Sequence, residues 1–146
     1  MPTRIARTAW NGSLQEGSGQ VELTSSGRGT FDVSFPKRAA DEAGGATSPE
    51  ELIAAAHSSC YAMQLSAIIA EAGGTPIALD VTAEVMLGPD PEGGFAITGI
   101  ALTVRGEVDG LDEAGFVKAA QAAKEGCPVS KALTGTTITL DAATEG

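Results

Sequence analysis

The feature that most constrains the fold is one long apolar segment, TSPEELIAAAHSSCYAMQLSAIIAEAGG, at residues 47–74. Ser48 can cap a helix that starts at Pro49, where two glutamates suit the positive end of the helix dipole. Gly73-Gly74 predicts its end near Glu71. Because the segment is rich in Ala and Ile on all sides, we expect a central helix. Steps of three and four predict a buried face made of Leu52, Ile53, Ala56, Cys60, Met63, Ala67 and Ile68.

The segments on either side of this helix indicate strands. Before it, TRIARTAW, QVELTS and TFDVSF alternate polar and apolar residues and predict an antiparallel meander. A charged, Gly-rich stretch, PKRAADEAGGA, is expected to be a loop. After the helix, IALDVTAEVML and GFAITGIALTVRGEV are expected to form a hairpin around the turn cluster GPDPEGG.

The last third of the chain predicts two more helices and a strand. Asp112 can cap a helix in LDEAGFVKAAQAAKEG, with an inner face of Phe116, Ala119, Ala120 and Ala123. Cys127-Pro128 opens a short helix through Leu133, and TTITLDA closes the chain as a strand. The order β-β-β-α-β-β-α-α-β is an α+β arrangement. With no repeat and no linker, residues 1–146 are expected to form a single domain.

The charge balance narrows the possible partners. A formal net charge of −10 disfavours nucleic acid and anionic membrane surfaces. No stretch approaches ~20 apolar residues, so we expect no membrane span. The N-terminus lacks an apolar run after its basic residues, so a cytoplasmic location is expected.

The chain has two cysteines, Cys60 and Cys127, and one histidine, His57. In a reducing cytoplasm, such a pair is expected to be reactive or transient and not a permanent disulfide. These three residues are too few for a four-ligand zinc site, and neither a metal nor an organic cofactor is expected.

The two cysteines have different expected environments. Cys127 falls at a helix N-cap, where backbone amides would stabilise a thiolate, although it could be only a small residue before proline. Cys60 lies in the middle of the central helix, where a free cysteine often packs as a small hydrophobe. Burial would raise its pKa, so a reactive Cys60 needs a cation beside it.

Four nearby residues could belong to such a site. His57 precedes Cys60 by one helical turn and could pair with it, or it could be a structural histidine. Arg38 suits a desolvated site better than Lys37, because its guanidinium stays charged and can hold a carboxylate in a fork. Glu50 is ten residues from Cys60, ~15 Å along one helix, so it is either a first-turn charge or acts through another group.

The run TSPEELIAAAHSSCYAMQLS and the later GCPVSKAL together resemble the OsmC/Ohr family of organic hydroperoxide reductases, and AAHSSC and CPVSKAL resemble its OsmC branch. The resemblance covers nearly the whole chain. It implies an intertwined homodimer with two central helices wrapped by antiparallel sheets. It also implies a role in defence against oxidative or osmotic stress.

The resemblance also implies roles for individual residues. Cys60 matches the peroxidatic cysteine and Cys127 the resolving cysteine, which would join in a disulfide after each turnover. Glu50 matches the glutamate of the family's Asn-Pro-Glu motif, with Ser48 here in place of the Asn. Arg38, or the adjacent Lys37, matches the arginine that activates the thiol. The substrate would be an alkyl or lipid hydroperoxide, and the reductant a dihydrolipoamide-type dithiol or a small thiol.

Two other classes of function compete with this one. A thiol hydrolase or transferase would use Cys60 with His57 and would not need Cys127. A non-catalytic binding protein on the same scaffold would need neither thiol.

Overall fold

The computed structural model describes residues 1–145, and the chain divides into two compact units, Met1–Leu52 and Ile53–Gly146. Each unit is described by itself below. One domain over residues 1–146 stays a prediction.

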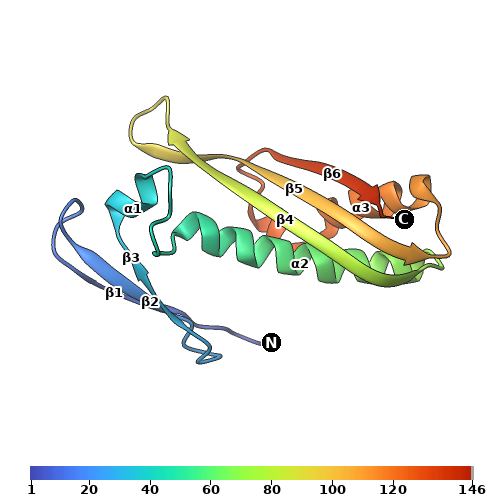
Figure 1. The fold of residues 1–146 in the computed structure, drawn as a ribbon, viewed down its shortest axis with the longest axis horizontal. Coiled ribbons are helices and arrows are strands. Elements are labelled where there is room, and N and C mark those ends of the chain that lie inside the picture. Colours follow the sequence, from blue (N-terminus) through green and yellow to red (C-terminus); the bar gives the residue numbers. More distant parts are fainter. Residues whose placement is uncertain (146) are drawn as a thin grey trace. The chain divides into compact units, whose positions relative to one another are not determined.

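The first unit contains the expected antiparallel meander, with strand order β1-β2-β3 (Figure 1). Its strands are β1 (Arg7–Asn11), β2 (Ser18–Glu22) and β3 (Thr30–Val33). Val21 is the buried residue of β2; it pairs with Thr8 on one side and Phe31 on the other.

A short helix, α1 (Phe35–Ala39), follows β3 where the sequence predicted a loop. Ser34 is its N-cap, since its hydroxyl accepts a hydrogen bond from the Lys37 N–H at 3.4 Å, and Pro36 lies in its first turn. The loop prediction was wrong here because charge and glycine dominate the segment, whereas a capping Ser and a first-turn Pro are enough to start one turn. Arg38 lies in the last turn of α1.

The long apolar segment forms α2 (Pro49–Glu71), with the predicted bounds. Ser48 caps it, accepting from the Glu51 N–H at 3.1 Å. The predicted buried face is wrong, because Ala56, Met63 and Ala67 are exposed. The buried residues of the helix in the second unit are His57, Tyr61, Leu65 and Ile69.

This helix also corrects the expectation that no segment is long and apolar enough for a membrane span. It has 23 residues, and an 18-residue window reaches a mean hydropathy of 1.3, enough by length and composition. The core helix of a water-soluble protein meets the same criterion, so the length and composition of α2 do not show that it spans a membrane. Only 22% of that window is buried within the described chain.

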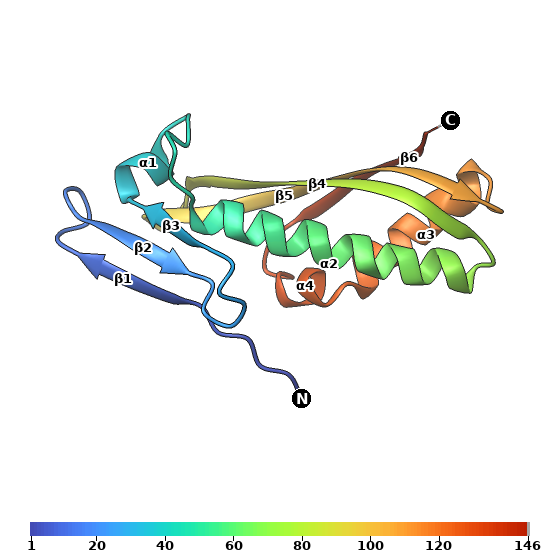
Figure 2. The same cartoon turned by 60° about the horizontal axis from the view of Figure 1, so that its bottom comes forward.

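The second unit pairs helices with a three-stranded sheet of order β4-β5-β6. In Figure 2, α2, α3 and α4 lie on one side of this sheet. The elements are β4 (Thr75–Pro89), β5 (Phe95–Asp109), α3 (Glu113–Gly126), α4 (Pro128–Ala132) and β6 (Ile138–Thr144). The hairpin β4–β5 is antiparallel as predicted, but β6 runs parallel to β5. The sheet is therefore mixed, because the chain crosses back through α3 and α4 before it adds β6.

The core of the second unit lies between α2, α3 and β5. Its α3 side is the predicted one, Phe116, Ala119, Ala120 and Ala123, and Asp112 caps that helix through the Gly115 N–H at 2.8 Å. Tyr61 donates to the Ala120 carbonyl at 2.8 Å, so its buried hydroxyl is satisfied. This packing fixes α2 against α3, the helix that ends immediately before Cys127.

Candidate active site

The two cysteines meet in the second unit. Both are free thiols, and their Sγ atoms are 3.2 Å apart, although 67 residues separate them. A disulfide needs the sulfurs at about 2.05 Å, so a shift of roughly 1 Å would join them. Cys127 is fully buried, whereas Cys60 is partly exposed. Of the two sulfurs, Cys60 is therefore the one that a molecule from solution can reach.

Cys127 takes the position that the Cys-Pro pair predicts, between two helices. It ends α3 and is the N-cap of α4, with Pro128 in the first turn. Its side chain makes no capping hydrogen bond of ordinary geometry. Burial acts to raise its pKa, but the polar groups near the sulfur (the Ser130 N–H, Cys60, the Ser130 hydroxyl and the Val129 N–H) lower the pKa overall.

Cys60 shows the opposite tendency. Burial raises the pKa of its thiol, the Val129 N–H partly offsets this, and the adjacent Cys127 raises it again. Of the two thiols, Cys127 is therefore the one that ionises more readily within this unit. Within this unit, the surroundings of Cys60 do not activate its thiol. Activation by an outside cation stays a prediction.

His57 is buried one turn before Cys60, but its partner is elsewhere. Its Nε2 lies 2.7 Å from the Ser130 hydroxyl, and Nδ1 has no hydrogen-bond partner among the described residues. Burial lowers the pKa of His57, so the ring is neutral near pH 7. The ring is thus engaged with α4, and neither nitrogen hydrogen-bonds Cys60 in the described chain.

Ser130 is the site residue that the sequence analysis missed. It follows Cys127 by three positions, which makes it the N3 residue of α4. Side chains at N3 commonly reach back toward the N-cap residue, so the spacing Cys-Pro-x-Ser contains the signal.

The first unit holds the other two predicted residues, Arg38 and Glu50, joined in a fork. Arg38 Nε donates to Glu50 Oε1 and Oε2 at 2.9 and 3.2 Å, and Nη2 donates to Oε1 at 2.8 Å. Glu50 is only 7% exposed, so the fork holds a carboxylate that water barely reaches. Lys37 is exposed. The hydrogen bond that this residue makes to Ser34 comes from its backbone N–H and not from its ammonium group.

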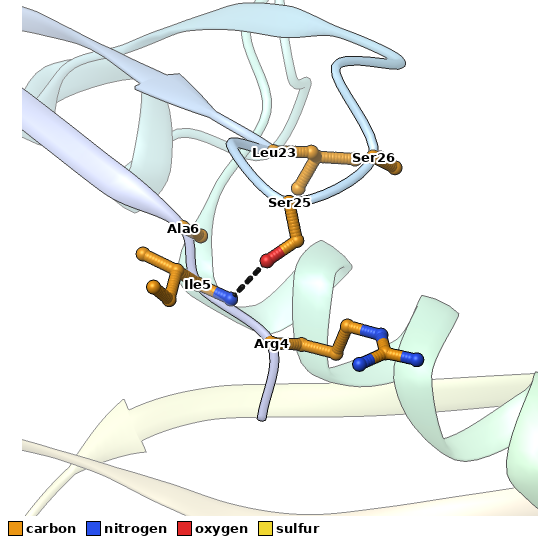
Figure 3. Close-up of a pocket in the computed structure, with 6 residues that line it drawn as sticks. All are labelled: Arg4, Ile5, Ala6, Leu23, Ser25 and Ser26. Atoms are coloured by element: carbon orange, nitrogen blue, oxygen red, sulfur yellow. Dashed lines mark hydrogen bonds between the residues drawn. The ribbon is translucent and has the colours of Figure 1, made fainter. Parts of the chain in front are cut away.

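Two hollows in the first unit differ in character. One of about 340 Å³ has Arg38 in its wall among mostly apolar side chains, including Trp10, Leu14, Val33 and Leu52. The other, about 410 Å³, is lined by Arg4, Ile5, Ala6, Leu23, Ser25 and Ser26 (Figure 3). In it the Ile5 N–H donates to Ser25 Oγ at 2.6 Å, and Arg4 is the one charged lining residue. The second hollow offers no strong nucleophile and no acid.

The described residues contain no group of three or more His, Cys, Asp or Glu side chains that could hold a metal ion. The chemistry that the site itself offers is that of two adjacent thiols with unequal pKa values.

Comparison with known proteins gives this arrangement a family. The family described as "OsmC-like protein" matches residues 41–141, a range that includes Glu50, Cys60 and Cys127 and begins just after Arg38. The chain is 44% identical over 132 residues to "Peroxiredoxin OsmC" of Escherichia coli (strain K12), which covers 90% of both chains.

Solved structures agree. The organic hydroperoxide resistance protein OhrB of Bacillus subtilis matches with a TM-score of 0.74 at 29% identity, over 94% of this chain and 97% of that one. An organic hydroperoxide resistance protein OsmC of Legionella pneumophila matches with a TM-score of 0.74 at 27% identity, over 98% of both chains. These relatives support a peroxidase function in stress defence. The chain belongs to the OsmC-like protein family.

Proposed function

We propose that this chain reduces organic hydroperoxides with Cys60 as the attacking thiol and Cys127 as the resolving thiol. The observation that carries the proposal is the pair of free sulfurs 3.2 Å apart. The partly exposed Cys60 can meet a peroxide, and the buried Cys127 cannot.

The chemistry runs in two steps. The Cys60 thiolate attacks one peroxide oxygen, so that an S–O bond forms while the O–O bond breaks. The alkoxide takes a proton and leaves as the alcohol, and Cys60 becomes a sulfenic acid. The Cys127 thiolate then attacks the Cys60 sulfur, forming the disulfide and releasing the hydroxyl, with a proton, as water.

Arg38 is proposed as the cation that activates Cys60, with Glu50 as the residue that orients it. A guanidinium near the thiol would lower the pKa of Cys60, which burial otherwise raises. It would also stabilise the negative charge that develops on the leaving oxygen. The fork with a buried Glu50 supports this role, because it fixes the direction of the guanidinium.

An alkyl hydroperoxide is the proposed substrate class. The hollow beside Arg38 has a volume of about 340 Å³ and mostly apolar walls, which suit an alkyl chain better than water. The names of the two structural relatives, both organic hydroperoxide resistance proteins, point the same way.

A homodimer and a cytoplasmic dithiol reductant complete the proposal. α2 is apolar on all sides, yet Ala56, Met63 and Ala67 remain exposed in the single chain, so a second copy would cover this face. The cytoplasm keeps a pool of reduced thiols, and a dihydrolipoamide-type dithiol or a small thiol there would reopen the disulfide.

The test is consumption of tert-butyl hydroperoxide by the purified protein with dithiothreitol as electron donor. We expect turnover that Cys60→Ser abolishes. Hydrogen peroxide, which has no alkyl group to bury, should be reduced more slowly. A wild-type protein that leaves tert-butyl hydroperoxide untouched would overturn the proposal.

A further inference from the structure

Four side chains from two helices form a row in the second unit. His57 Nε2 lies 2.7 Å from Ser130 Oγ, Ser130 follows the N-cap residue Cys127 by three positions in the first turn of α4, and Cys127 Sγ lies 3.2 Å from Cys60 Sγ. His57 and Cys60 come from α2, whereas Ser130 and Cys127 come from α4 and its cap. The peroxidase chemistry described above uses the two sulfurs and leaves His57 and Ser130 without a role.

The tautomer of His57 decides which groups donate and which accept along this row. His57 is fully buried and neutral, so one ring nitrogen carries a proton and the other a lone pair. If Nε2 carries the proton, it donates to Ser130 Oγ, and Nδ1, which has no partner among the described residues, is only an acceptor. The other tautomer would bury an N–H donor without a partner, which is the costlier arrangement. Ser130 Oγ then accepts from His57, and its own proton is free for the Cys127 sulfur.

The other titratable side chain beside Cys127 does not compete for this role. Tyr61 donates its hydroxyl to the Ala120 carbonyl, and burial, followed by the charge of Cys127, raises its pKa so that it stays neutral. The groups that lower the pKa of Cys127 are thus Cys60, the Ser130 and Val129 N–H groups and the Ser130 hydroxyl.

We propose that His57 and Ser130 are positioning residues whose hydrogen bonds hold the Cys127 sulfur as a thiolate and so set the direction in which the disulfide is reopened. The inference rests on the proposed Cys60–Cys127 disulfide. The attacking thiolate of a dithiol meets the accessible Cys60 sulfur and forms a mixed disulfide with it. The bond to Cys127 breaks, and Cys127 leaves with the electron pair as the stabilised thiolate. The second thiol of the reductant then displaces Cys60 and closes the reductant's own disulfide.

The test is a titration of the Cys127 thiolate by its ultraviolet absorbance, made in a Cys60→Ser background where Cys127 is the only thiol. Ser130→Ala should move the titration to higher pH and reduce the thiolate fraction below the midpoint about tenfold, the effect of losing one hydrogen bond to a charged group. His57→Leu should move it the same way by less. His57→Gln, which can keep an N–H donor near the Nε2 position, should restore the parent curve.

Ser58→Ala is the matched control. Among the described residues, the Ser58 hydroxyl on α2 donates only to the Ala55 carbonyl, so its loss should leave the curve unchanged. An unshifted titration in Ser130→Ala, or equal shifts in His57→Leu and His57→Gln, would overturn the proposed role of His57 and Ser130. Should His57→Leu fail to fold, Ser130→Ala and His57→Gln still decide the result. The titration needs no peroxide. Failure of the role proposed for His57 and Ser130 can therefore be distinguished from failure of the proposed peroxidase function.

Discussion

At the scale of single residues, the two thiols are neighbours with opposite tendencies. Polar groups at the start of α4 lower the pKa of Cys127 despite burial, whereas burial raises the pKa of Cys60. The more accessible sulfur is therefore the less activated one within its own unit. A cation from outside that unit is what our account requires, and Arg38 is the proposed source.

Replacing Arg38 tests this requirement. Arg38→Met should lower kcat/KM for an alkyl hydroperoxide about 100-fold, the usual effect of removing one group that stabilises developing charge. Glu50→Gln should have a smaller effect, because the guanidinium remains but loses its charged partner. Steady-state kinetics provide the measurement. Lys37→Met, a change at the exposed neighbouring position, is the control; if it costs as much as Arg38→Met, the assignment of the cation is wrong.

His57 makes stability depend on pH. Burial lowers its pKa in the folded state below the ordinary value of 6.5, so below that pH the unfolded chain binds a proton that the folded chain does not. Stability is therefore lost as pH falls from about 6.5 to the folded-state pKa, by at most about 1.4 kcal/mol per pH unit. Urea unfolding at several pH values should show this slope in the wild type and a shallower slope in His57→Gln. Equal slopes would contradict a buried, neutral His57.

At the scale of elements, local sequence signals predicted where helices begin and end better than they predicted how the helices pack. Ser48, Asp112 and the Cys127-Pro128 pair each mark a helix start, because a capping signal is contained within four residues. The inner face of α3 was predicted correctly because its other side is polar. The buried face of α2 was not, because a helix that is apolar all round has no periodicity to orient it.

Contacts between distant segments could not be read from the sequence. Ser130 meets His57 across 73 positions, and the parallel pairing of β6 with β5 depends on how α3 and α4 carry the chain back. Both follow from tertiary packing. Cys60 and Cys127 were brought together in the sequence analysis only by the family resemblance, not by any local pattern.

The packing of α3 on β5 leaves no room for an added methyl group at Gly106. A Cβ there would lie 2.7 and 2.8 Å from two Phe116 ring carbons and 3.0 Å from Leu79. Phe116 is fully buried, so the ring cannot turn away into solvent. Gly106→Ala should lower the free energy of unfolding by about 1–3 kcal/mol in denaturant titrations. Gly135→Ala, where an added Cβ meets nothing within 4 Å, is the control and should change stability little.

At the scale of the whole molecule, the exposed apolar face of α2 needs a cover. Met63 is 69% exposed in the single chain, in the middle of a helix that is apolar enough to qualify by composition as a membrane span. Burial against a second copy would remove this surface from water, which is the basis of the proposed homodimer.

Light scattering coupled to size-exclusion chromatography should report twice the mass of one chain for the wild type. Met63→Glu should shift the protein toward the monomer, because a carboxylate at the covered face is costly to bury. Val117→Glu, at a residue on α3 that is 41% exposed, should leave the dimer intact. A monomeric wild type at micromolar concentration would contradict the dimer.

The central claim is that a peroxide oxidises Cys60 and that Cys127 resolves it in the same chain. Non-reducing mass spectrometry after one equivalent of cumene hydroperoxide tests it most directly. Our account predicts an intramolecular loss of two hydrogens in the wild type. Cys127→Ser should show no such loss and should instead gain one oxygen on Cys60. A wild-type mass that does not change, or a disulfide that links two chains, would contradict the account.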